Sequence, residues 1–403
     1  MYIKRGKLKL TAINKLSILN LISNIGMAAV GTIWAIYLES ILKKPSYVGF
    51  LITFFTIISL TAFIFLIPLI ERQSKSRLYM ISLALYLVSY ILFGVLSHVY
   101  AVVILGAFMA IIVSLRMDTF GIMVSDKSKD GKISANEGLI YTFLNLSWMI
   151  GPLVAGYTTS LFGVRSVFIV AAIFIFLTLI LFKSFDIRDN RKRKRTNQNV
   201  IKIFIDFFRN KHRVVNYILS GGINFWWVLV YVYLPLMILE AEADGRIIGY
   251  ALFAIVVPLV LLEYPFGLLA EKIGFKKIFF TGYLILAVIG TSAFFVNNIF
   301  IIILLLTTAS IGAAMIESTT EAYFFSIVPK KNQRDKYYGP YNTTVEIHHA
   351  IASFIGGLIL LIFPFKFLFL FFGAIMLLMV ILSLKVKEMI DIKNEEIEGS
   401  LEK

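Results

Sequence analysis

The sequence contains no cysteine, and Asp, Glu, Lys and Arg together make up only 16% of its 403 residues. The absence of cysteine excludes disulfides, thiolate metal sites and catalysis by a thiol. The scarcity of charge, in a chain that is 59% hydrophobic, excludes an ordinary soluble domain. The sequence also lacks the peptidase motif HExxH and the nucleotide-binding loop GxxxxGK[ST]. We therefore predict a membrane protein that is not an enzyme and that holds no metal or cofactor.

Long apolar segments are what the sequence has in abundance. A helix needs about twenty apolar residues to cross roughly 30 Å of hydrocarbon. Some connections are very short, such as Ser97-His98 and Asn297-Asn298, so consecutive helices must form antiparallel hairpins. We predict an all-α membrane protein with twelve transmembrane helices. Their expected spans are 16–42, 46–70, 78–97, 99–125, 138–162, 164–184, 214–239, 247–270, 277–297, 299–328, 338–364 and 366–386.

The net charge of +15 is distributed unevenly over the two sides of the predicted helices. Of the 39 Lys and Arg residues, 33 lie on the side of the N-terminus, 5 lie on the other side, and Arg116 lies within a helix. This asymmetry follows the positive-inside rule and puts both termini in the cytoplasm. Because the cations are not gathered on a soluble domain, we expect the lipid bilayer as a partner and no nucleic acid. We recognise no cleavable signal peptide and expect a multi-pass protein of the plasma membrane.

The chain divides into two halves of six predicted helices each. We assign 1–184 to an N-terminal bundle, 185–213 to a basic cytoplasmic linker, 214–387 to a C-terminal bundle and 388–403 to a cytoplasmic tail. The linker contains five consecutive cations at 191–195, followed by apolar residues at helical spacing from Ile201 to Phe208. The linker is either a surface helix on anionic lipid or a solvated connection that only enforces the topology.

One stretch, GLLAEKIGFKK from Gly267 to Lys277, marks this division, because a weaker copy of it lies about two hundred residues earlier. Each copy places an acid at the helix end that carries negative partial charge, so the acid needs a partner from outside its own helix. Gly267 lies one turn before the acid Glu271, where a missing side chain lets a neighbouring helix approach closely. The matching positions are Gly49 and Gly249, Glu71-Arg72 and Glu271-Lys272, Ser74 and Gly274, and Arg77 and Lys277.

The repeated stretch resembles the GxxxDxxGxKK signature of the major facilitator superfamily, with Glu in place of Asp. The second copy matches well, whereas the first has Ile67 for the leading glycine and Ser74 for the turn glycine. The resemblance covers nearly the whole chain and implies two pseudo-symmetric six-helix bundles that work by alternating access. It implies a central cavity lined by the first, fourth, seventh and tenth helices. The residues of the implied cytoplasmic gate are Glu71, Arg72, Arg77, Gly267, Glu271, Lys272, Gly274 and Lys277.

Ionisable side chains deep within the apolar segments fall on the fourth, eighth, tenth and eleventh helices. Each charge in hydrocarbon costs roughly 2.5–3.5 kcal/mol on insertion scales, so such residues mark a cavity or a paired site. Counted at about 1.5 Å per residue, they share one layer roughly 10–16 Å from the cytoplasmic end, as a secondary transporter requires. The third, sixth, ninth and twelfth helices have none and should face lipid. The layer comprises Arg116, Glu263, Glu317, Glu321, Glu346 and His349.

Within this layer, Glu317 and Glu321 share a helix face at i, i+4, and Glu346 and His349 share another. We expect the three glutamates to accept protons or to contact a substrate cation, with Arg116 as their charge partner. Alternatively, Arg116, Glu317 and Glu321 form a static ion network that fastens the halves together. Asn24 and Asn224, on the first and seventh helices, are candidates for binding a polar substrate group or for joining helices.

The fourth and fifth segments also resemble, loosely, two further signatures of the family. Ile112 and Arg116 fit lxxxRxxqG, which is associated with proton coupling, although Thr119 replaces the glutamine. Pro152 removes a helix hydrogen bond while its small neighbours permit close packing, which gives a pliable contact between helices. A kinked packing helix without bearing on transport is the alternative. The residues that fit the antiporter signature GxxxGPxxGG are Ser147, Gly151, Pro152 and Gly156.

From these features we predict a monomeric secondary active transporter that uses a proton gradient to export small amphipathic molecules. The alternatives are a proton-coupled symporter of a small polar nutrient and a non-transporting membrane sensor on the same scaffold. The string DKSKDGKISANE at 126–137 fits the ligand pattern of an EF-hand calcium loop. Three lysines are interleaved with these ligands, and we therefore expect no metal there.

Overall fold

The structure is a computed structural model that describes residues 10–128, 133–187, 200–328 and 331–387. Within these ranges the chain is helical and contains no strand. Twelve helical segments are long and apolar enough to cross a membrane. The predicted all-α fold with twelve spans is therefore confirmed. The predicted ends differ by a few residues, as for the span 138–162, whose helix begins at Ile133.

Six long helices form the N-terminal half. They alternate in direction, as the short connections between them require. They are α1 (Ala12–Leu42), α2 (Pro45–Arg72), α3 (Lys75–Val95), α4 (Val99–Lys127), α5 (Ile133–Phe162) and α6 (Ser166–Phe185).

The C-terminal half begins with a short helix and continues with six spans. The first span is interrupted by a π-helical turn, η1, and the third ends in a 3₁₀ turn, η2. The elements are α7 (Val200–Phe208), α8 (Lys211–Val228), η1 (Leu229–Tyr233), α9 (Leu234–Glu240), α10 (Gly245–Ile273), α11 (Phe275–Ser292), η2 (Ala293–Phe295), α12 (Ile299–Ile327), α13 (Lys331–Ile362) and α14 (Lys366–Ser383).

The two copies of the repeated stretch make the same turn in different ways. Gly274, between α10 and α11, has φ +91°, a conformation that a residue with a Cβ atom rarely adopts. Ser74, between α2 and α3, has φ −67°, and its hydroxyl accepts a hydrogen bond from the backbone N–H of Arg77. The second copy thus requires its glycine, whereas the first copy uses a serine that caps α3.

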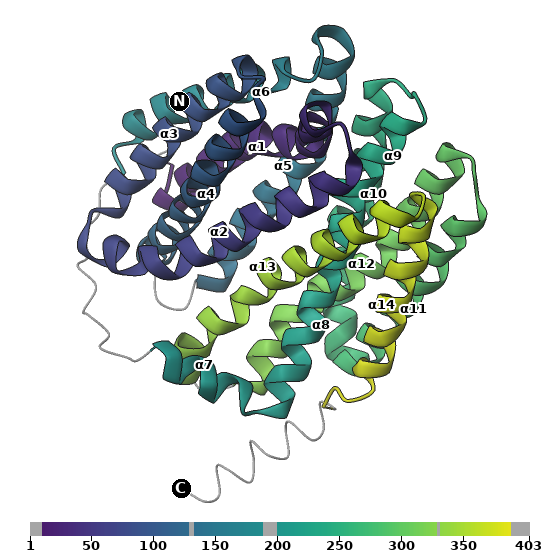
Figure 1. Cartoon of the computed structure of the whole chain (residues 1–403). Helices are drawn as coiled ribbons and strands as arrows, with labels where there is room; N and C mark the ends of the chain where they lie inside the picture. The colour runs from purple at the N-terminus through teal and green to yellow at the C-terminus, as the bar shows by residue number, and fades with distance from the viewer. Residues whose placement is uncertain (1–9, 129–132, 188–199, 329–330, 388–403) are drawn as a thin grey trace, which may run out of the picture.

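The two halves lie side by side and meet along two helix pairs, α2 with α13 and α5 with α10 (Figure 1). The third, sixth, ninth and twelfth spans, which the sequence predicts to face lipid, lie elsewhere, with α3 packed on α6 and α11 packed on α14. We call the end of the molecule that carries α7 the linker side. The opposite end, with the loops 43–44, 163–165 and 241–244, is the far side.

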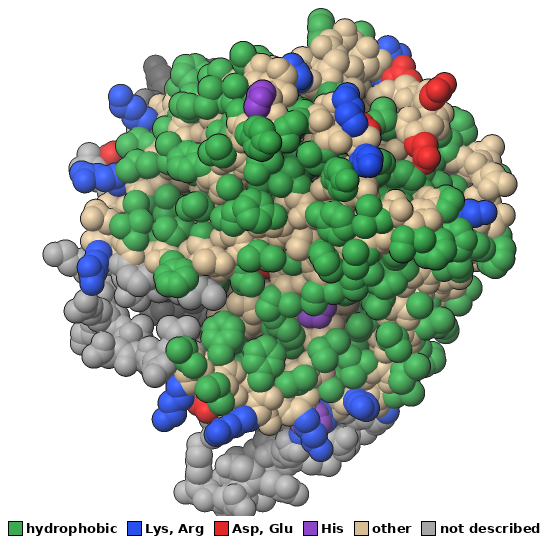
Figure 2. Space-filling model, viewed as in Figure 1, with side chains coloured by type: hydrophobic (Ala, Val, Ile, Leu, Met, Phe, Trp, Pro, Cys, Tyr) green, Lys and Arg blue, Asp and Glu red, His purple; other side chains and the backbone are tan. Residues whose placement is uncertain are grey.

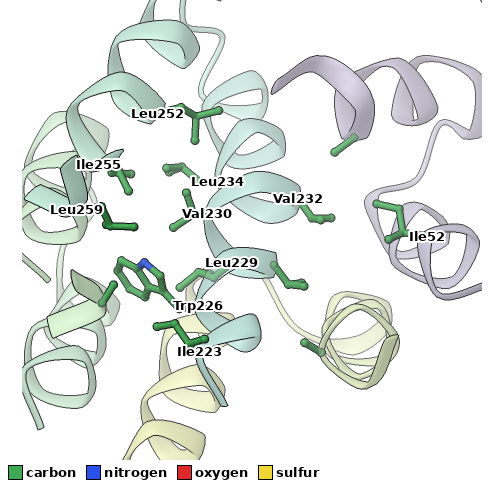
Figure 3. Packing of buried hydrophobic residues seen from close by; sticks show 14 of the residues in the cluster. Ile52, Ile223, Trp226, Leu229, Val230, Val232, Leu234, Leu252, Ile255 and Leu259 are labelled. Atoms are coloured by element: carbon green, nitrogen blue, oxygen red, sulfur yellow. The ribbon is translucent and has the colours of Figure 1, made fainter. Parts of the chain in front are cut away.

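One part of the core of the C-terminal half lies between the interrupted span and α10 (Figure 3). Trp226 is fully buried there, next to Val230 and Leu259. Val232, on the other side of η1, points toward Ile52 of α2. The interrupted span therefore packs on its own half with one face and on the N-terminal half with another.

Gly249 brings the backbone of α10 against the backbone of α5. A Cβ atom at Gly249 would lie 2.6 Å from the carbonyl oxygen of Pro152 and 3.1 Å from Cα of Gly156. Beside this contact, the hydroxyls of Tyr157 and Tyr250 are 2.5 Å apart. Gly151, on another face of α5, lies against Ala28 of α1 in the same close way. The small residues of α5 thus serve two interfaces, one within its half and one between the halves.

Gly49, the repeat of Gly249, makes the equivalent contact between α2 and α13. A Cβ atom at Gly49 would lie 2.5 Å from the carbonyl oxygen of Ser353 and 3.0 Å from Cα of Gly357. Nearby, Thr53 donates a hydrogen bond to the carbonyl of Ala350, at 3.2 Å. Both glycine contacts belong to the far-side portions of their helices, so the closest backbone approaches between the halves lie toward that side.

We predict that Gly249→Ala lowers the stability of the folded protein by about 1–3 kcal/mol, because the new Cβ atom would overlap a backbone oxygen. Thermal unfolding of the purified protein in detergent measures this as a lower Tm. Gly121→Ala is the matched control, since a Cβ atom at Gly121 meets nothing within 4 Å. Equal Tm values for the two variants would contradict the proposed close contact.

Candidate functional site

Glu317 and Trp227 form the centre of the candidate site. Trp227 Nε1 donates a hydrogen bond to Glu317 Oε1 at 2.6 Å, which joins α8 to α12. Both side chains are only partly buried, although they lie in the middle portions of membrane-spanning helices. Glu317 is therefore not sealed in the core, and the group that donates a hydrogen bond to its carboxylate is neutral.

Two further glutamates lie near Glu317. Glu321 follows one turn later on the same face of α12 and accepts a hydrogen bond from the hydroxyl of Tyr338 at 2.9 Å. Glu263 of α10 accepts a hydrogen bond from Asn145 Nδ2 of α5 at 3.0 Å, which joins the two halves. The three carboxylates are close enough to interact electrostatically. We call Glu263, Glu317 and Glu321 the acidic cluster.

The acidic cluster is surrounded by neutral groups. Among residues 10–128, 133–187, 200–328 and 331–387, no ion pair involves any of its three members. A carboxylate at this depth is held at lower cost when it binds a proton or a cation. The cluster is therefore suited to take up protons or a positively charged group.

A row of aromatic rings leads from Glu317 to the N-terminal half. Trp227 lies beside Tyr231, with ring centroids 5.7 Å apart, and Trp148 of α5 meets Tyr231 edge to face at 5.1 Å. Tyr231 belongs to the π-helical turn η1. Such turns commonly occur at functional sites, and here the turn places an aromatic ring between the two halves.

Arg116 is buried in the N-terminal half, with 8% of its surface exposed. Its Nη2 atom is 3.5 Å from Asn24 Oδ1 of α1, and its guanidinium lies 5.8 Å from the ring of Tyr86. Asn24 itself donates a 2.6 Å hydrogen bond to Asn20 Oδ1. In the described part of the chain Arg116 forms no ion pair with a carboxylate, so the expected pairing with the glutamates is not formed in this conformation. The positive member of the predicted layer, Arg116, is thus not paired with the glutamates of that layer.

The remaining members of the predicted layer lie at other contacts. His349 Nδ1 is 3.4 Å from the hydroxyl of Thr56, so this histidine lies between α13 and α2. Glu346, one turn earlier on the same face, is partly buried. Asn224 is buried and donates a hydrogen bond to the carbonyl of Gly221, at 3.3 Å, within its own helix. Of the predicted residues, only Glu317 and Glu321 are brought together with Glu263.

The predicted gate residues lie at the linker side. Glu271, Lys272 and Lys277 are exposed, and no described residue pairs with Glu271. Gly267 faces α12, where a Cβ atom would lie 3.9 Å from the carbonyl oxygen of Ser318. In the first copy, the side chains of Arg72 and Arg77 are exposed, and that of Glu71 lies outside the described structure. The sequence predicts that Glu271 pairs with a group outside its own helix. In this conformation Glu271 forms no such pair with a described residue.

The calcium-loop string falls partly on residues 129–132, which lie outside the described structure. Asp126 and Ser128 precede this gap, and Asn136 Nδ2 donates a hydrogen bond to Ser128 Oγ at 3.0 Å. No group of three His, Asp or Glu side chains with metal-binding geometry occurs among the residues that the structure describes.

Comparison with protein-family models shows which family the chain belongs to. The model of the Major Facilitator Superfamily matches residues 16–257 and 225–399. The chain belongs to the major facilitator superfamily. As a member of this superfamily it is a multi-pass membrane protein with a transporter fold. A search of curated proteins found no match.

Solved structures show the same superfamily fold. A POT family transporter in complex with a thioalcohol-conjugated peptide has a TM-score of 0.78 and 12% identity, over 92% of this chain and 95% of that chain. The nucleoside transporter NupG has a TM-score of 0.74 and 11% identity, over 94% of this chain and 100% of that chain. At this identity the likeness concerns the fold alone.

Several residues of the site in this superfamily member were not predicted from the sequence. Asn145 and Tyr338 are polar residues that point at carboxylates, but neither spacing nor charge singles them out. Trp227 is part of a Trp-Trp pair whose two members look equivalent in the sequence, although Trp226 is buried in the core and only Trp227 reaches a glutamate. The position of Tyr231 can be predicted only if the π-helical turn is known, and the sequence has no signal for this turn.

We predict that Trp227 and Glu317 are energetically coupled. A double-mutant cycle with Trp227→Phe and Glu317→Leu, which removes the acceptor, should give a coupling energy of about 1–3 kcal/mol in unfolding experiments, as for a hydrogen bond to a charged group. The same cycle with Trp226→Phe is the control, since no described residue accepts a hydrogen bond from the Trp226 N–H. Coupling energies of equal size in the two cycles would contradict a specific hydrogen bond between Trp227 and Glu317.

Proposed function

We propose that the protein is a proton-coupled secondary transporter that exports small amphipathic molecules from the cytoplasm. The observation that carries the proposal is the acidic cluster. Three carboxylates lie close together in the C-terminal half, each accepts a hydrogen bond from a neutral donor, and all three are partly exposed. Protons and organic cations are the ligands that such a cluster binds with the largest electrostatic gain.

The surroundings of the acidic cluster support an amphipathic substrate. Trp148, Tyr231 and Trp227 form a partly exposed aromatic row that ends at Glu317. Aromatic faces bind apolar groups and also attract cations. A substrate with an apolar body and a polar or positive group therefore finds both kinds of contact in one place.

The contacts between the halves support alternating access. The glycine contacts of α2 with α13 and of α5 with α10 hold the halves together toward the far side. With the positive-inside orientation, the linker side faces the cytoplasm. The conformation is then one in which the substrate site opens inward, and exchange with a second conformation would open it outward.

Reconstitution into proteoliposomes tests this proposal. With a vesicle interior more acidic than the medium, an antiporter should accumulate the amphipathic cation ethidium inside, and a protonophore should abolish the accumulation. Accumulation of a polar nutrient from an acidic medium would instead support symport. If no compound moves under either gradient, the sensor alternative is favoured.

We predict that Glu317→Gln and Glu321→Gln each reduce pH-driven accumulation to the level of protein-free vesicles, because the amide cannot take up a proton. Glu240→Gln is the control, since Glu240 is exposed at the far-side end of α9 and should be dispensable. Initial rates of dye uptake are measured at equal protein content. Full pH-driven transport in both glutamine variants would refute the assignment of the acidic cluster as the proton site.

A further inference from the structure

The short helix α7 is attached to the C-terminal half by one of its faces. Phe207 is completely buried there. Lys336 Nζ forms an ion pair with Asp206 Oδ2 at 2.9 Å, and this hydrogen bond holds the pKa of Asp206 below its usual range. The pair therefore stays ionised at neutral pH. The residues that surround Phe207 are Tyr217, Phe324, Val328 and Tyr341.

Next to this contact, α7 has an apolar stripe that is largely exposed, although the Phe208 ring also meets Tyr217 of α8 at 5.1 Å. Ile201, Phe204, Ile205 and Phe208 share this face, because residues three and four apart lie above one another on a helix. Ile201 is 72% exposed, Ile205 is 51% exposed and Phe208 is 42% exposed. Phe207, the residue that attaches α7, lies beside this face, three residues after Phe204. The protein thus covers one edge of the apolar surface of α7 and leaves Ile201 and Ile205 the most exposed.

Cations border the exposed apolar face. Lys202 and Arg209 lie on its flank, seven residues apart and therefore on the same side of the helix, and both are exposed. Lys211, at the start of α8, is exposed as well. Lys and Arg side chains gather along this end of the molecule in Figure 2. A stripe of apolar residues beside a row of cations is the arrangement of helices that lie in the headgroup layer of a bilayer.

The position of α7 places this face at the level of the membrane boundary. The helix ends three residues before Lys211, where a membrane-spanning segment begins, and it packs against the linker-side ends of α8 and α13 (Figure 1). Both spans are long and apolar enough to cross the bilayer, so their linker-side ends lie near its surface. Because α7 packs against these ends, it lies at the boundary between the acyl chains and the headgroups.

We propose that α7 is an anionic-lipid binding element that inserts Ile201, Phe204, Ile205 and Phe208 into the headgroup layer while Lys202, Arg209 and Lys211 contact phosphate groups. The apolar stripe accounts for insertion, and the cations account for the preference for anionic headgroups. A polar protein partner would leave the stripe uncovered, so the bilayer is the occupant that satisfies both features.

The absence of cysteine from the chain makes a direct test possible. A single nitroxide label is attached to Ile205→Cys on the apolar face or to Lys202→Cys on the flank of the full-length protein. Each variant is reconstituted into vesicles of phosphatidylcholine alone and of phosphatidylcholine with phosphatidylglycerol. Collision rates with oxygen, which partitions into lipid, and with a water-soluble nickel complex report the surroundings of each label.

We expect the label at position 205 to collide mainly with oxygen and the label at position 202 mainly with the nickel complex, most clearly in the anionic vesicles. Adding Lys211→Gln and Arg209→Gln to Ile205→Cys should reduce the preference of the inserted state for anionic over neutral vesicles by roughly 25-fold, since each cation contributes about fivefold. Nickel access to position 205 equal to that at position 202 in both vesicles would overturn the proposal. Equal insertion in both vesicle types would overturn the anionic preference.

Discussion

The structure depends on two places where the backbone of one half touches the backbone of the other. In a membrane the lipid is as apolar as the side chains, so helices associate through close packing and hydrogen bonds rather than through burial of apolar surface. Gly249 against Pro152 and Gly156, and Gly49 against Ser353 and Gly357, supply that packing at equivalent positions. The hydrogen bonds between the halves that involve Tyr157, Thr53 and Asn145 lie along the same two helix pairs, α2 with α13 and α5 with α10.

Charge is divided between the halves in a way that suits exchange of ligands. The acidic cluster belongs to the C-terminal half, whereas Arg116 is buried in the N-terminal half with Asn24 and Tyr86. A permanent ion pair between them would bind the halves together and leave the carboxylates unavailable. Neutral donors support the glutamates instead, so under the proposed function the energy of the cluster changes with what it binds, and this dependence would couple ligand occupancy to conformation.

Features that depend on composition and repetition, such as the number of spans, can be predicted from the sequence. Contacts that depend on the path of individual helices cannot. Apolar run lengths predict the twelve spans, and the repeat pairs Gly49 with Gly249 before their contacts are known. The face shared by Glu317 and Glu321 follows from helical spacing. The expected partner of these glutamates, Arg116, is not their partner here, because depth in the membrane fixes a residue's level but not its direction. Trp227, Tyr338 and Asn145 are donors whose roles appear only when the helices are placed in three dimensions.

The π-helical turn at Leu229–Tyr233 has a consequence for the evolution of the seventh span. A turn of this kind corresponds to one inserted residue in an α-helix, and each residue rotates the helix by about 100°. Deleting one residue there would restore a regular α-helix. It would also rotate the side chains before the turn by about 100° relative to those after it. Trp227 could then no longer reach Glu317 while Tyr233 donates to the carbonyl of Ser353. Two contacts thus depend on the length of this segment, and a homologue without the extra residue should have lost one of them.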